Sequence, residues 1–314
     1  MISKHKIIVI IGPTASGKSS LALDLAKKIS NIAIVNADAF QVYKDLQIIT
    51  ASPTKQDLLA VNHYLYNYLD VGASYSVAKY IQDVNQVLSS LSEASSVSIL
   101  VGGSHMYIHN LLYGLDDVPA TNDNIAKQTT QLFDDIGIKN FYELLVSLDP
   151  KIIGLVGSND TQRMLRAYNV KIQTGMSIID FHTKHKHSSS AFLNKYDIKI
   201  ISVQPDRALL YSNCNARVEF MFKNGAIEEA SNIITKNQDI LSSSVKAIGF
   251  EEIKSYLTSQ LSYEEAVNIT QQRTRNYAKR QLTWCNNKFH DKILYDATDS
   301  LHNIAKQLDN WLNL

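Results

Sequence analysis

Three runs of apolar residues near the start of the chain predict buried strands. They cover residues 7–11, 32–36 and 97–101, and a fourth run follows at 198–203. The first three are nearly continuous in Val, Ile, Leu and Ala instead of alternating with polar residues. Strands covered on both faces of a parallel sheet have this pattern. The sequence therefore predicts a parallel sheet inside the protein.

Helical patterns lie between and after these runs, at residues 19–30, 77–91 and 107–113. This alternation is typical of a nucleotide-binding α/β domain, in which ligands bind at the carboxyl ends of the strands. From residue 207 to the end the pattern is helical. Residues 121–195 lose the strand signal and become helical and polar. We therefore predict a core of residues 1–120 and 196–314, interrupted by a helical insertion at 121–195.

Composition changes this picture little. Lys and Arg number 31 against 30 Asp and Glu, so the overall charge does not indicate a nucleic-acid partner. The two cysteines lie far apart in the sequence, and both are expected to be reduced thiols. The short apolar run at the N-terminus does not resemble a secretory signal, and no stretch approaches the roughly 20 apolar residues of a membrane span. A cytoplasmic protein without a membrane partner is expected.

A phosphate-binding motif, G-x-x-x-x-G-K-[ST], follows the first apolar run directly and precedes a helical pattern. Its backbone N–H groups would surround phosphate oxygens at a helix N-terminus. The lysine would add a positive charge, and the hydroxyl of Ser19 would bind Mg²⁺. A glycine-rich turn between a strand and a helix is the alternative interpretation. The motif consists of Gly12, Pro13, Thr14, Ala15, Ser16, Gly17, Lys18 and Ser19.

With this motif, the expected fold is an α/β fold with a P-loop NTPase-like parallel sheet flanked by helices and an all-helical insertion. Asp38 follows the second strand and would lie at the same sheet edge as the loop, as a general base or a magnesium ligand. An aspartate that caps a turn is the alternative. Gly102 and Gly103 end the third strand without the acidic residue that holds magnesium in ATP-driven motors, which argues against such a machine.

A late helix is predicted to begin after Ser262, because Ser262 and Glu265 have capping-box spacing. At 100° per residue, one face of this helix carries Arg273, Tyr277, Arg280 and Trp284. Such a basic and aromatic face can bind phosphates and stack on an unpaired base. In the alternative interpretation the aromatic rings are buried and the arginines are solvated.

Five sequence blocks, in this order, resemble the tRNA dimethylallyltransferase (isopentenyltransferase, IPP transferase) family along almost the whole chain. The first is the phosphate-binding motif with Pro-Thr-Ala inside it. The others are Asp38-Ala-Phe-Gln-Val-Tyr43, Leu100-Val-Gly-Gly-Ser104 with Met106-Tyr107, Asn159-Asp-Thr-Gln-Arg163 with Arg166-Ala167, and Ala278-Lys-Arg-Gln-Leu-Thr-Trp284. The last block is close to a family signature.

The resemblance implies transfer of a dimethylallyl group from dimethylallyl diphosphate to the exocyclic amine of adenosine 37, in tRNAs that read codons starting with U. It implies that the phosphate-binding motif holds the diphosphate with Mg²⁺ as cofactor, that Asp38 is the base, and that Thr14 and Arg217 contact the phosphates. A single chain matches every group required, so a monomer is expected.

The resemblance also implies which residues contact the tRNA, and that the insertion grips the anticodon stem. The implied contacts are Asp38, Ala39, Phe40, Gln41, Ser104, Gln162, Arg163, Arg166, Lys246, Gly249, Lys279, Arg280, Gln281, Thr283 and Trp284.

Four residues depart from the family pattern. Ile49 and Ser52 stand where the family usually has Gly and Lys, Asn213 stands where it commonly has another arginine, and Glu251 occupies a site that is often basic or neutral. These changes affect the expected strength of the diphosphate clamp and of one RNA contact. A cluster of His182, His185 and His187 has no family counterpart; a solvated loop is its simpler interpretation, with metal binding as the alternative.

Three other functions remain as hypotheses. A small-molecule kinase would place ATP in the loop and would need no RNA, but it leaves the insertion and the basic helix without a task. Prenylation of free adenine nucleotides keeps the chemistry without the tRNA. A non-catalytic RNA-binding protein is disfavoured because Lys18, Ser19 and Asp38 are all present.

Overall fold

The computed structural model of the chain describes residues 4–94, 97–184, 191–236, 245–296 and 301–312. Contacts within it divide the chain into two compact units, residues 1–113 with 191–314, and residues 114–190. These boundaries lie a few residues before those expected from the sequence, so the helix at Ala191–Lys195 belongs to the first unit. No helix among the described residues is long and apolar enough to cross a membrane.

Within the described part of the first unit, six parallel strands form one sheet in the order β3-β2-β4-β1-β5-β6. The four predicted strands are confirmed within one residue at each end. Two short strands at the sheet edges were not predicted, and β6 corrects the expectation that the chain after residue 207 is entirely helical. The strands are β1 (Lys6–Ile11), β2 (Ile32–Asn36), β3 (Asn62–Tyr64), β4 (Val97–Gly102), β5 (Asp197–Val203) and β6 (Ile293–Tyr295).

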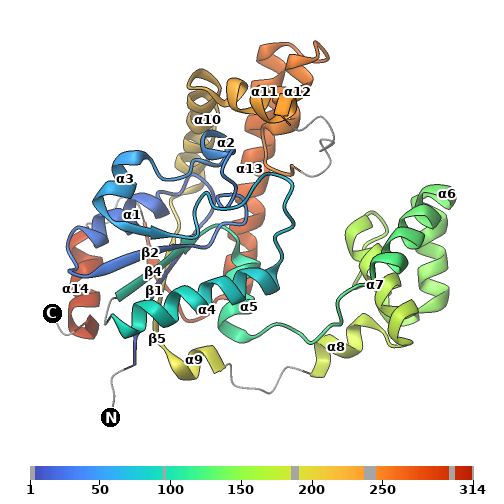
Figure 1. The fold of residues 1–314 in the computed structure, drawn as a ribbon, viewed down its shortest axis with the longest axis horizontal. Coiled ribbons are helices and arrows are strands. Elements are labelled where there is room, and N and C mark those ends of the chain that lie inside the picture. The colour runs from blue at the N-terminus through green and yellow to red at the C-terminus, as the bar shows by residue number, and fades with distance from the viewer. Residues whose placement is uncertain (1–3, 95–96, 185–190, 237–244, 297–300, 313–314) are drawn as a thin grey trace. The chain divides into compact units, whose positions relative to one another are not determined.

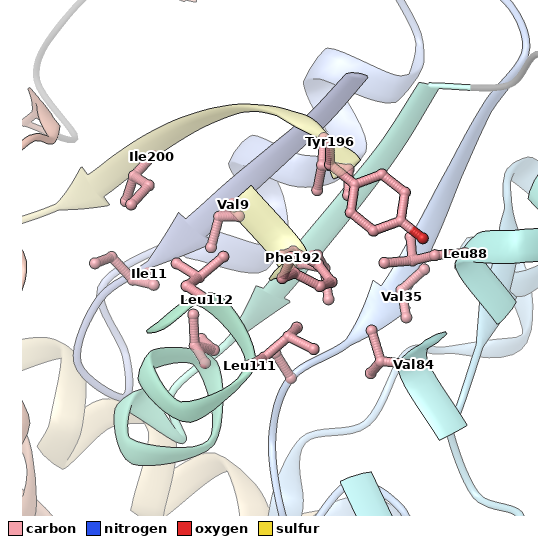
Figure 2. Packing of buried hydrophobic residues seen from close by; sticks show 14 of the residues in the cluster. Val9, Ile11, Val35, Val84, Leu88, Leu111, Leu112, Phe192, Tyr196 and Ile200 are labelled. Atoms are coloured by element: carbon pink, nitrogen blue, oxygen red, sulfur yellow. The ribbon is translucent and has the colours of Figure 1, made fainter. Parts of the chain in front are cut away.

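Helices cover both faces of this sheet (Figure 1). On one face the apolar side chains of β1, β2 and β4 pack against α4 (Val77–Glu93), α5 (His105–Tyr113) and α9 (Ala191–Lys195). Figure 2 shows this layer, in which Val9 and Val35 of the sheet lie beside Leu88, Leu111 and Phe192. The opposite face packs against α1 (Lys18–Ala26) and α14 (Leu301–Leu312). Both faces are therefore buried, as the continuous apolar runs indicated.

A third apolar cluster joins the remaining helices of the first unit, which are grouped together in Figure 1. The predicted capping box is present, because the Ser262 hydroxyl accepts from the Glu265 N–H and the Glu265 carboxylate accepts from the Ser262 N–H. These helices are α2 (Gln47–Thr50), α10 (Arg207–Lys223), α11 (Ala226–Lys236), α12 (Phe250–Leu257) and α13 (Tyr263–Lys288); α3 (Lys55–Ala60) precedes β3.

The regular elements of the second unit are all helices among its described residues. Its elements are α6 (Asp123–Leu148), η1 (Pro150–Ile152), α7 (Thr161–Thr174) and α8 (Ile178–Lys184). They surround a small core that contains Phe141, Leu145 and Met164. His182 lies in α8, whereas composition suggested a loop there. His185 and His187 lie outside the described residues, so the metal hypothesis for this cluster stays untested.

The strand register brings the candidate residues to one sheet edge. Ile11 of β1 pairs with Gly102 of β4 and with Ser202 of β5, and Asn36 of β2 pairs with Val101. The segments that follow β1, β2 and β4 therefore leave the sheet side by side, at its carboxyl edge. This is where ligands bind in open parallel sheets.

Candidate active site

The phosphate-binding motif forms a loop between β1 and α1. Gly17 caps the helix with φ +91°, a left-handed conformation that glycine adopts without strain. Gly12 lies so close to β5 that an added Cβ would stand 2.7 Å from the carbonyl oxygen of Val203. Both glycines of the motif therefore have a geometric reason. The loop presents the N-terminus of α1, where an anion is stabilised.

Protein groups hold the loop from two sides. The Thr14 N–H donates to Oε1 of Gln281 on α13, at 2.8 Å. The Asn213 side chain on α10 donates to the carbonyl oxygen of Ala15, at 3.3 Å. Ala15 has φ +61°, a left-handed conformation that is unusual for a residue with a Cβ. Asn213 therefore supports the loop backbone at Ala15.

Asp38 lies in the adjoining loop after β2. Its N–H donates to the Asn36 side chain, at 2.8 Å, and its Oδ1 accepts from the Phe40 N–H, at 3.0 Å. Asn36 is buried and also donates to the carbonyl oxygens of Asp38 and Leu65. These bonds fix the loop around Asp38. The carboxylate lines the cavity described below.

Two cations lie near this carboxylate. Burial lowers the pKa of Lys18 to about 8, Asp38 acts in the opposite direction, and Arg217 lowers it further. Burial also lowers the pKa of Arg217, again opposed by Asp38. Each cation is partly removed from water, so its charge acts strongly on an anion bound beside it. The pocket therefore has a positive end built around the loop.

These groups line one cavity of about 490 Å³ in the first unit. The polar end is formed by residues 14–20 with Asp38 and Arg217. An apolar wall continues from it and consists of Phe40, Ile49, Val218, Met221, Ala247 and Ile248. A cavity that joins a cationic end to an apolar wall suits a ligand with an anionic head and a short apolar tail.

One face of α13 closes the cavity. Arg273, Tyr277 and Arg280 line it, and the Arg280 guanidinium stands 5.7 Å from the centre of the Tyr277 ring. Arg273 forms an ion pair with the buried Glu252. Trp284, the fourth residue of the predicted face, instead stacks on His105 with ring centroids 6.1 Å apart. The predicted face therefore divides into a cavity-lining part and a packed part.

Comparison with known proteins identifies the family of the chain. The family model described as IPP transferase matches residues 41–288. The chain belongs to the IPP transferase family. It is 38% identical to a tRNA dimethylallyltransferase of Rickettsia felis, over 99% of this chain and 100% of the relative. A tRNA dimethylallyltransferase of Rickettsia bellii (strain OSU 85-389) is 38% identical over 95% of this chain and 93% of the relative.

Solved structures of proteins with the same named activity have a similar fold. The crystal structure of a tRNA isopentenylpyrophosphate transferase from Staphylococcus epidermidis is similar with a TM-score of 0.69 and 29% identity, over 99% of each chain. A eukaryotic dimethylallyltransferase acting on tRNA has a TM-score of 0.81 and 27% identity, over 98% of this chain and 80% of that one.

Most of the other candidate residues in this IPP transferase follow the strand ends or α13. Ser104 accepts from the Ala39 N–H at 2.8 Å, and Gln41 donates to the carbonyl oxygens of Thr50 and Ala51. Lys246 is exposed at the cavity rim. Gly249 has φ +105°, and an added Cβ would stand 2.5 Å from Cε of Met221. Lys279 and Thr283 are exposed on α13.

Three candidates lie in the second unit, on α7. Gln162 and Arg163 are exposed, and Arg163 forms an ion pair with Asp160 at 3.2 Å. Arg166 instead binds the segment that leads into α6, because it donates to the Thr121 hydroxyl and to the carbonyl oxygen of Pro119. Arg166 therefore has a structural task in the unit, whatever else it binds.

Sequence patterns did not indicate the apolar wall or the supporting residue Glu229. Asn213, Arg217 and Met221 stand four residues apart, a spacing that puts them on one face of α10 and could have indicated the wall. Glu229 accepts from the N–H groups of Ile48 and Ile49, and so fixes the start of α2 beside the cavity. No local pattern indicates that contact, since 180 residues separate its partners.

Proposed function

We infer that this chain is a tRNA dimethylallyltransferase, which transfers a dimethylallyl group from dimethylallyl diphosphate to the exocyclic amine of adenosine 37 in tRNA. The observation that carries this inference is the single cavity that joins the phosphate-binding loop, Asp38 and the basic face of α13. Family membership supports the same reaction. A kinase would use the loop but would give the α13 face no ligand.

The donor substrate fits the two ends of the cavity. The diphosphate binds the loop, Lys18 and Arg217, and the five-carbon group lies along the apolar wall near Val218 and Met221. Buried Ser16 supports an anion here, because its hydroxyl has no hydrogen-bond partner among the described residues. Thr14 lines the same end, and its hydroxyl offers a further donor to the phosphates.

The reaction forms one bond and breaks another. The adenine amine nitrogen bonds to the allylic carbon, the carbon–oxygen bond to diphosphate breaks, and its electron pair leaves with the diphosphate. The amine is a poor nucleophile because its lone pair is delocalised into the ring. Asp38 accepts the proton that the nitrogen loses, while Lys18 and Arg217 stabilise the charge that grows on the leaving group. Asp38, Thr14 and Arg217 are thus the proposed catalytic residues.

Magnesium is part of the proposal. The exposed Ser19 hydroxyl lines the diphosphate end, and no group of three His, Cys, Asp or Glu ligands occurs among the described residues. Mg²⁺ in phosphate-transfer sites commonly takes one or two protein ligands, with phosphate oxygens and water completing its shell. Ser19 fits this role. When bound, Mg²⁺ neutralises charge on the departing diphosphate.

The tRNA ligand accounts for the exposed cations. The target base has to leave the anticodon-loop stack to reach Asp38, as in other enzymes that act on a base. We propose that Lys246, Lys279 and Arg280 contact the RNA near the cavity, and that Gln162 and Arg163 of the second unit hold the anticodon stem. A monomer carries all of these groups.

Labelled substrate tests this function directly. The purified protein is incubated with magnesium, radiolabelled dimethylallyl diphosphate and one acceptor at a time: an unmodified anticodon stem-loop RNA, AMP or ATP. We expect label in the RNA alone, at the adenosine beside the anticodon. Label in AMP or ATP with none in RNA would show prenylation of free nucleotides. ATP hydrolysis driven by a small acceptor, with no label transferred, would favour the kinase.

A further inference from the structure

Gln281 lies inside the protein at the centre of the exposed basic segment of α13. Its side chain is 6% exposed, whereas its neighbours Lys279, Arg280 and Thr283 face solvent. The resemblance implied that Gln281 contacts tRNA with these neighbours. Because the Gln281 side chain is buried, its hydrogen-bond partners lie inside the protein.

Three hydrogen bonds join Gln281 to two loops of the active site and to the start of α5. Its Oε1 accepts from the Thr14 N–H at 2.8 Å, and its Nε2 donates to the carbonyl oxygen of Gly103 at 2.9 Å. Its own carbonyl oxygen lies 3.0 Å from Nδ1 of His105. One side chain therefore ties the phosphate-binding loop after β1 to the glycine turn after β4.

The glycine turn explains why this amide fits. An added Cβ at Gly103 would stand 2.5 Å from Nε2 of Gln281 and 3.4 Å from Oδ2 of Asp38. At Gly102, the same addition would stand 2.0 Å from the carbonyl oxygen of Ala37, next to Asp38. The two glycines therefore let the Asp38 loop and Gln281 approach the end of β4. Asp38 and Gln281 both lie against Gly103.

We propose that Gln281 is a positioning residue that fixes the phosphate-binding loop, and so the diphosphate, at a set distance from Asp38. The Thr14 N–H is directed to Gln281 and the Ser16 N–H donates to the carbonyl oxygen of Pro13, so both ends of this part of the loop are held by protein groups. Gln281 acts through Thr14 and Gly103, without contact to the reacting atoms. The catalytic part of this role rests on the proposed function. The predicted effect on diphosphate binding is independent of it.

A hydrogen-bond-free side chain of similar length, Gln281→Met, tests the proposal. The control is Gln271→Met, the same change on the same helix, at a side chain that contacts Asn215 and Glu219 of α10 instead of the loops. Calorimetry with inorganic diphosphate and magnesium measures the affinity of the phosphate-binding loop for diphosphate. Fluorescence anisotropy with an anticodon stem-loop measures RNA binding. Steady-state transfer assays give kcat and the KM for each substrate.

We expect Gln281→Met to weaken diphosphate binding by about tenfold and to lower kcat. The stem-loop affinity should stay within about twofold, as should all constants of the control. A loss of stem-loop affinity with unchanged diphosphate affinity would assign Gln281 to RNA binding and overturn the proposal. Unchanged constants throughout would also overturn it.

A second variant covers the case in which Gln281→Met does not fold. Gly103→Ala places a methyl group against the Gln281 amide and leaves Gln281 itself in place. The proposal expects the same loss of diphosphate affinity, and an unchanged affinity would contradict it. If the wild-type protein binds diphosphate yet transfers no dimethylallyl group, the proposed function fails. The diphosphate comparison still decides the role of Gln281.

Discussion

The two sides of the active-site cavity differ in how far their positively charged side chains are exposed to solvent. On the diphosphate side, burial lowers the pKa of both Lys18 and Arg217. On the side that we propose binds RNA, Lys246, Lys279 and Arg280 are exposed. Buried, fixed charges stabilise a leaving group without reorganisation of water. Exposed charges attract a polyanion over a longer range and are screened by salt. This difference supports the proposal that the first side stabilises the leaving group and the second side binds the tRNA.

Replacing Asp38 tests the diphosphate side with the largest expected effect. Asp38→Asn keeps an oxygen for the Phe40 N–H, so the loop should hold its shape. It removes the proton acceptor, and turnover should fall by about 10²- to 10⁴-fold with little change in diphosphate affinity. Asp70→Asn is the control, because Asp70 lies outside the cavity in an ion pair with Lys44. Full turnover in Asp38→Asn would remove Asp38 from the mechanism.

Arg217→Met tests the buried charge next. Loss of a charge-assisted hydrogen bond to the diphosphate should weaken dimethylallyl diphosphate binding by about 10- to 100-fold, measured by calorimetry. The control is Arg207→Met on the same helix, where the guanidinium lies 5.2 Å from the centre of the Tyr211 ring and does not line the cavity. Equal effects of both variants would show that general charge, and not the site, attracts the donor.

The proposed RNA-binding side should respond more weakly. Arg280→Ala should reduce stem-loop affinity by about three- to tenfold at low salt and lower the slope of log Kd against log salt concentration by about 1. Arg275→Ala is the matched control, because Arg275 binds Asn215 of α10 and does not line the cavity. Unchanged affinity and slope in Arg280→Ala would make the α13 face structural.

The smallest expected effect is a pH signature of His105, which lies buried behind the cavity lining and packs against Trp284. Burial, with the nearby Lys18 charge, lowers the pKa of His105 to about 4, although Asp38 and the Gln281 carbonyl act in the opposite direction. The unfolded chain binds this proton near its ordinary pKa of 6.5. The contribution of neutral His105 to the free energy of unfolding is therefore fully present above pH 6.5 and is lost as the pH falls towards 4.

We expect His105 to contribute about 1 kcal/mol of this loss between pH 7 and 5.5. Urea unfolding of wild type and His105→Asn at both pH values measures it. The variant should lose less stability than the wild type over the same interval. Equal losses would show that His105 titrates normally and that its surroundings are wetter than the structure indicates.

Local sequence patterns predicted the elements whose structure depends on residues close together in the sequence. Continuous apolar runs indicated β1 and β2, because each residue is buried on one face or the other. The short β3 has polar Asn62 and His63 and is paired only with β2, so no apolar run marks it. At β6, three residues gave too short a pattern to compete with the helical segments around them.

Some residues of the candidate site could likewise be predicted from local sequence patterns, and others could not. The phosphate-binding motif and Asp38 follow predicted strands, so sheet register alone brings them together. Arg217 became a candidate only through the family resemblance. The bond from Thr14 to Gln281 spans 267 residues, and only the folded chain brings these two groups together.

A crystal structure with the unreactive thiolo analogue of dimethylallyl diphosphate and an anticodon stem-loop would test the central claim most directly. The account predicts the diphosphate on the loop of residues 12–19, the five-carbon group along Val218 and Met221, and the flipped adenosine with its exocyclic nitrogen at hydrogen-bond distance from Asp38. A diphosphate bound away from the loop, or an adenosine still stacked in the RNA and out of reach of Asp38, would contradict it.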